Sequence, residues 1–148
     1  KKTSLRNYAF KALLVTCPYR AESNHPLNGW SVIDIAFHNS SITNYTFVMS
    51  LIIEDEKVEF HGIAFDMLVN PLCHIDGAYY TALYHAKRCV ELTNQQDVGY
   101  LTNLLFLHDV PETVVSEKEA FNVAKKILTL DPNNEIANEF MSENRNNK

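Results

Sequence analysis

Apolar residues recur along most of the chain at spacings of three and four residues, with polar residues between them. This period places the apolar side chains on one face of an α-helix. Prolines and clusters of turn-forming residues separate the periodic segments. The pattern predicts a series of helices. One begins near residue 76, and the others cover residues 4–16, 32–38, 98–108, 116–130 and 133–141.

One segment, residues 46–65, fits two structures. Two apolar runs, then a charged turn and a short alternating stretch, are compatible with a β-hairpin. The helical spacing of Phe60, Ala64, Met67 and Leu68 instead indicates helices. Helices are the favoured prediction, and the hairpin remains an open alternative.

Capping residues mark the ends of several predicted helices. Asp76 is a candidate N-cap for a helix with small residues on one face, namely Ala78, Ala82, Ala86 and Cys89. Ser116 and Glu119 have the spacing of a capping box. The Asp-Pro pair at 131–132 is expected to stop one helix and cap the next. The polar tail, residues 142–148, is predicted to fray.

An internal repeat links two of these helices. Residues 82–94 align without a gap with residues 120–132, an offset of 38 residues. Two alanines, a lysine and a leucine recur identically, and the other matches include Arg88 with Lys126 and Cys89 with Ile127. Such self-similarity is typical of stacked helical pairs.

The second copy resembles the closing helix of a tetratricopeptide repeat. The resemblance is carried by Ala120, Ala124 and the run Leu-Thr-Leu-Asp-Pro-Asn-Asn at 128–134. The preceding helix lacks the Trp, Gly and Tyr pattern of that family, and the offset of 38 exceeds the family's spacing of about 34 residues. The resemblance therefore implies a divergent helical repeat with tetratricopeptide-like helix pairs over residues 76–143.

The predicted fold class is all-α. We expect a single helical domain over residues 1–148, in which antiparallel helix pairs stack into a short solenoid. The composition fits this fold, since 46% of the residues are hydrophobic and 21% are charged. Only four glycines and five prolines are present, few for an all-β protein with frequent turns.

The charge balance narrows the choice of partner. The formal net charge is −5, which argues against a nucleic-acid partner because phosphate binding needs a cationic surface.

No apolar run approaches the roughly 20 residues of a spanning helix, so no membrane association is expected. The three cysteines are widely spaced and odd in number, which indicates free thiols and a reducing, cytoplasmic location.

No catalytic motif is present. The sequence contains no HExxH, GxSxG, GxGxxG or P-loop pattern, so we expect neither enzymatic activity nor a cofactor. One alternative is a small metal-dependent enzyme whose site combines Cys73, His74 and Asp76 with His61 or His38. The favoured prediction assigns no metal ligand and no catalytic residue.

Aromatic and acidic residues indicate a protein-binding role instead. Tyrosine suits surfaces that are both apolar and hydrogen-bonding, and acidic neighbours attract a basic partner. The candidate partner-binding residues are Tyr80, Tyr84, Asp97, Tyr100, Asp109 and Glu112.

The predicted function is therefore that of a non-catalytic protein-binding module. In size, charge and lack of chemistry the chain resembles immunity proteins, which neutralise toxin effectors by masking a basic cleft. An adaptor or peptide-sensing helical-repeat protein is the alternative. The expected partner is a basic protein, either a toxin domain or a peptide, and the chain itself is expected to be a monomer or a weak homo-oligomer.

Overall fold

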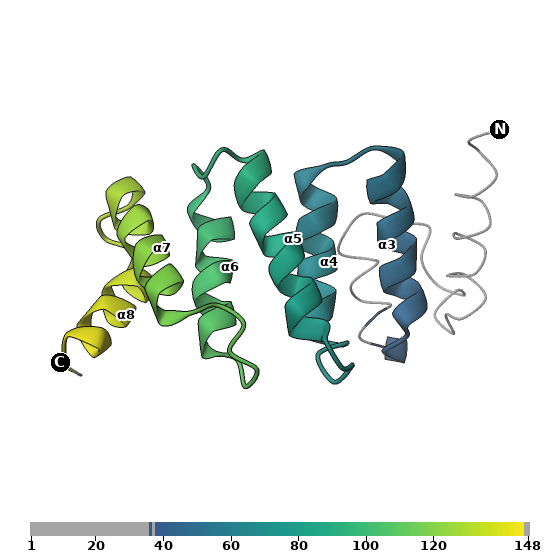
Figure 1. Cartoon of the computed structure of the whole chain (residues 1–148). Helices are drawn as coiled ribbons and strands as arrows, with labels where there is room; N and C mark the ends of the chain where they lie inside the picture. The colour runs from purple at the N-terminus through teal and green to yellow at the C-terminus, as the bar shows by residue number, and fades with distance from the viewer. Residues whose placement is uncertain (1–35, 37, 147–148) are drawn as a thin grey trace. The chain divides into compact units, whose positions relative to one another are not determined.

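The computed structural model describes Ala36 and residues 38–146. The predicted helix over 4–16 and most of the one over 32–38 lie outside the described residues. Within the described part the chain forms six helices and no strand, which confirms the all-α fold class. In chain order these are α3 (Ile42–Glu54), α4 (Val58–Val69), α5 (Ala78–Leu92), α6 (Val98–Asp109), α7 (Glu117–Leu130) and α8 (Glu135–Asn146) (Figure 1).

The described residues fall into two units, with the boundary between residues 82 and 83. In the first unit α3 packs against α4. In the second unit α6 packs against α7 and α7 packs against α8. The boundary falls inside the continuous helix α5, so no turn or linker in the sequence marks it.

Residues 46–65 form the end of α3, a short turn and the start of α4, so the hairpin alternative is wrong. The apolar runs place Phe47, Val48 and Ile52 on one buried face of α3, because these positions share one side of a helix. Ile53 falls outside that face and is 81% exposed. The charged residues between the runs form the turn from α3 to α4, where Lys57 pairs with Asp55 at 2.8 Å. This segment thus contributes to the core of the first unit.

The start of α5 differs from the prediction. The helix begins at Ala78 and follows Gly77, whose φ of +76° is a left-handed conformation that glycine adopts without strain. Asp76 therefore lies too early to be the N-cap. The small face is confirmed, since Ala82, Ala86 and Cys89 are fully buried.

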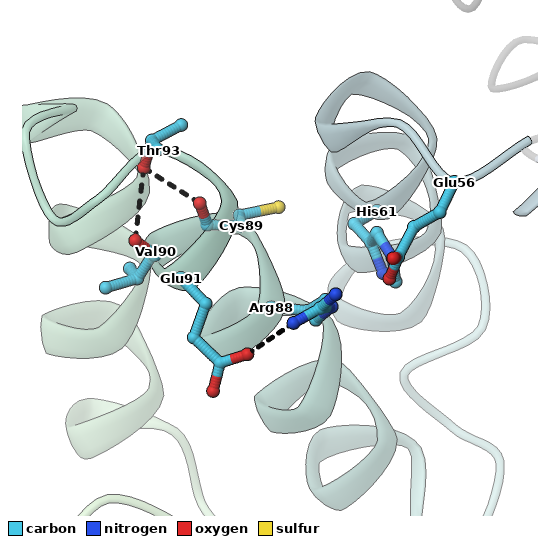
Figure 2. Close-up of polar contacts among 7 residues, drawn as sticks. All are labelled: Glu56, His61, Arg88, Cys89, Val90, Glu91 and Thr93. Atoms are coloured by element: carbon cyan, nitrogen blue, oxygen red, sulfur yellow. Dashed lines mark hydrogen bonds and ion pairs between the residues drawn. The ribbon is translucent and has the colours of Figure 1, made fainter.

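The end of α5 is a tight, well-bonded turn. Asn94 and Gln95 both have positive φ, and the Gln95 N–H donates to the Val90 carbonyl at 2.8 Å. The Thr93 hydroxyl contacts the carbonyls of Cys89 at 2.8 Å and Val90 at 3.3 Å (Figure 2). These bonds satisfy carbonyls that a helix end leaves without partners.

Helices α6 and α7 match their predicted ranges to within about a residue. The Ser116 hydroxyl accepts a hydrogen bond from the Glu119 N–H at 3.3 Å, so Ser116 is the N-cap of α7. The predicted inner face of α7 is buried over Ala120, Val123, Ala124 and Ile127, while Leu128 is half-buried.

Helix α8 begins and ends later than predicted. The Asn134 side chain, rather than that of Asp131, accepts a hydrogen bond from the Ala137 N–H at 3.1 Å. Asp131 instead ends α7, and its carboxylate accepts from the Asn133 N–H at 3.2 Å. The helix continues to Asn146, into the polar segment for which fraying was predicted. Ala137 and Phe140 form its buried face.

Candidate functional site: a groove lined by α5, α6 and α7

Two of the predicted binding residues are exposed on α5. Tyr80 is 65% exposed and Tyr84 is 54% exposed. They lie four residues apart, so they fall on the same face of the helix, opposite its buried alanines. The Tyr84 ring makes an edge contact with the His85 ring, with the centroids 5.0 Å apart. This face of α5 therefore presents large aromatic side chains to solvent.

The other predicted residues lie near the two ends of α6 and in the loop that follows it. The Asp97 carboxylate accepts a hydrogen bond from the Tyr100 N–H at 3.1 Å, which makes Asp97 the N-cap of α6. Asp109 ends the same helix and Glu112 follows in the next loop. Because a helix of 12 residues is about 18 Å long, these acidic residues do not form one patch.

The second unit contains an open groove between α5, α6 and α7. Its cavity volume is about 340 Å³. Apolar side chains form much of the lining, with contributions from all three helices, and they are Val90, Leu101, Leu104 and Val123. The polar side chains around them are Lys87, Glu91, Gln95, Glu119, Asn122 and Lys126. An apolar centre with a polar rim is the usual composition of a protein-binding surface.

Ion pairs hold most of the charged groups at this groove. The Lys87 ammonium on α5 lies 2.9 Å from the Glu119 carboxylate on α7. The Arg88 guanidinium lies 2.7 Å from the Glu91 carboxylate, within α5 (Figure 2). Both anionic groups of the lining are thus occupied. Lys126, two turns along α7 from Glu119, has no ion pair with any described residue.

The groove was not predicted from the sequence. The sequence indicates Glu119 only as a capping-box residue, whereas the Glu119 side chain reaches Lys87 on another helix. The spacing of Glu119, Asn122, Val123 and Lys126 on one face of α7 was the available signal. That spacing cannot reveal which other helix lies opposite, and the groove depends on that contact.

The residues of the alternative metal site do not assemble. Cys73, His74 and Asp76 are exposed in the segment between α4 and α5. Among the described residues, no three His, Cys, Asp or Glu side chains gather as metal ligands would. His61 is fully buried, and its Nε2 lies 3.1 Å from a Glu56 carboxylate oxygen (Figure 2). This pairing gives a buried polar side chain a structural partner.

The fold shows an all-α protein of packed neighbouring helices, and comparison with known proteins does not identify a family. The described part of the protein is an all-α assembly of packed neighbouring helices, an arrangement compatible with a helical repeat. None of its described helices has the length and apolar character required to cross a membrane. No protein family, curated protein or solved structure was found to match the chain.

Proposed function

We propose that this protein is a non-catalytic protein-binding module that uses the exposed face of α5 and the groove beside it. The observation that carries the proposal is the exposure of Tyr84 directly alongside the groove. Tyr84 is 54% exposed and lies one helical turn before Lys87, which lines the groove. Large aromatic side chains that remain accessible are typical anchors of protein interfaces.

The form of the groove favours a polypeptide over a small metabolite as its ligand. Small-molecule sites enclose most of the ligand surface. This groove instead lies along the surfaces of three helices and has charged side chains at its edges. Helical grooves of this kind accept an extended segment or a helix of a partner.

The specific form of the proposal is neutralisation of a toxin effector, as immunity proteins achieve. It is supported by the net charge of −5, which would speed association with a partner of positive net charge. Exposed carboxylates at Asp109 and Glu112 add to that attraction. A tetratricopeptide-like adaptor or peptide sensor uses the same surface and differs only in its partner.

Site-specific photo-crosslinking tests the proposed surface. A photo-reactive phenylalanine analogue at Tyr84 is expected to capture a defined protein from a lysate of the source cells. The matched control carries the analogue at Ile53, which is 81% exposed in the first unit and away from the groove residues in sequence. A protein captured at both positions equally would contradict the assignment of the binding surface to α5. Capture only at Tyr84, with mass spectrometric identification, would support it and identify the partner.

A further inference from the structure

The charges of the groove are unevenly compensated. Its lining contains two lysines and two glutamates. Lys87 neutralises Glu119, and Arg88, which lies outside the lining, neutralises Glu91. The ammonium group of Lys126 is therefore the lining charge that no described residue compensates.

Lys126 lies on the same face of α7 as the apolar lining residue Val123 and away from the Lys87–Glu119 ion pair. Val123 precedes Lys126 by three residues on the same face of α7, and both line the groove. Lys126 lies about 10 Å along the helix axis from Glu119, at a rise of about 1.5 Å per residue. The Lys87–Glu119 pair consequently lies toward one end of the α7 wall and the uncompensated ammonium toward the other.

We propose that the groove binds a segment of a partner protein that places an apolar side chain on Val90, Leu101, Leu104 and Val123 and an Asp or Glu carboxylate at Lys126. The proposal rests on the proposed protein-binding function and specifies the chemistry of its ligand. A carboxylate at Lys126 forms a charge-assisted hydrogen bond in a partly desolvated setting. A basic side chain there would face an ammonium group of like charge.

The acidic group preferred at Lys126 is opposite in sign to the partner charge that the net charge of the protein attracts. A net charge of −5 acts at long range and attracts a partner that is basic as a whole. Contacts within the groove act at a few ångströms and depend on the groups present there. A basic partner that carries one exposed apolar-acidic segment satisfies both conditions.

Selection from a displayed library of random twelve-residue peptides is the experiment that tests the proposal, followed by a double-mutant cycle. The enriched peptides are expected to combine an apolar residue with Asp or Glu. One such peptide and its Glu→Gln form are then measured by fluorescence anisotropy against the wild-type protein and Lys126→Gln. We expect the wild-type protein to favour the Glu peptide about tenfold and the variant to bind both peptides alike.

Lys118→Gln is the matched control, because Lys118 is an exposed lysine on the same helix outside the groove lining. It should keep the full preference for the Glu peptide. Enriched peptides without acidic residues, no enrichment at all, or a preference that survives in Lys126→Gln would each overturn the inference. A concentration-dependent dimer that Lys126→Gln abolishes would also overturn it, because the occupant would then be a second copy of this chain. Specific crosslinking from Tyr84 alongside any of these results would leave the proposed function intact.

Discussion

Ile127 offers the sharpest test of the packing in the second unit. Its side chain is fully buried on the inner face of α7. Ile127→Ala removes three carbon groups, each contributing about 0.8 kcal/mol of transfer free energy, or roughly 2.4 kcal/mol in total. The cavity that remains raises the expected loss in the free energy of unfolding to about 3 to 4 kcal/mol.

The assay is urea unfolding at 25 °C followed by circular dichroism at 222 nm. With a slope of about 2 kcal/mol per molar urea, the unfolding midpoint of Ile127→Ala should fall by about 1.5 to 2 M. The matched control is Ile136→Ala on α8, the same substitution at a side chain that is 52% exposed. The control should change the unfolding free energy by less than about 1 kcal/mol. Equal effects of the two substitutions would refute the assignment of the inner face of α7.

Three further substitutions test individual contacts. His108→Ala should lower the unfolding free energy by about 2 kcal/mol in the same urea assay, because the His108 Nδ1–H donates to the Val115 carbonyl at 2.9 Å and the ring packs on Phe140. Ser116→Ala should lower the free energy of unfolding by about 1 kcal/mol, because it removes the N-cap of α7. An unchanged free energy of unfolding would contradict this cap. Partial desolvation by neighbouring atoms raises the pKa of the Asp66 carboxyl above its ordinary value of 3.8. The folded state therefore holds this proton more tightly than the unfolded state does, and stability falls as pH rises from 3.8 through the raised pKa. Asp66→Asn should flatten that fall in urea titrations at successive pH values, and an unchanged slope would contradict the shift.

Helices could be predicted from the sequence wherever a long apolar period ended at a strong capping or stop signal. Helix α6 follows Asp97 and ends before Pro111, and both signals act through local backbone chemistry. The start of α5 was misplaced because Gly77 forms a left-handed turn that replaces capping by Asp76. The range 46–65 was ambiguous because short apolar runs fit both helix and strand, and tertiary packing decides between them.

The candidate site was only partly predictable, for a different physical reason. Exposure of Tyr84 follows from its position opposite the small residues of α5, which the sequence displays directly. The position of Asp97 directly before α6 is sufficient to predict its role as an N-cap, because capping depends on local backbone chemistry. The contact between Lys87 and Glu119 joins helices that are not adjacent in sequence, and no local pattern encodes it.

The two helical segments that align in the sequence, residues 82–94 and 120–132, are buried at the same aligned positions and differ in contacts at exposed ones. At aligned positions, Ala82 and Ala120, Ala86 and Ala124, and Cys89 and Ile127 are all fully buried. Packing restricts these positions to side chains of suitable size, so the inner faces remain alike. The outer faces are not restricted in this way. Lys87 pairs with Glu119 at 2.9 Å, whereas the aligned Lys125 lies 4.4 Å from the centroid of the Phe121 ring. The two aligned lysines thus have different partners, and of these two contacts only the Lys87–Glu119 pair lies at the groove.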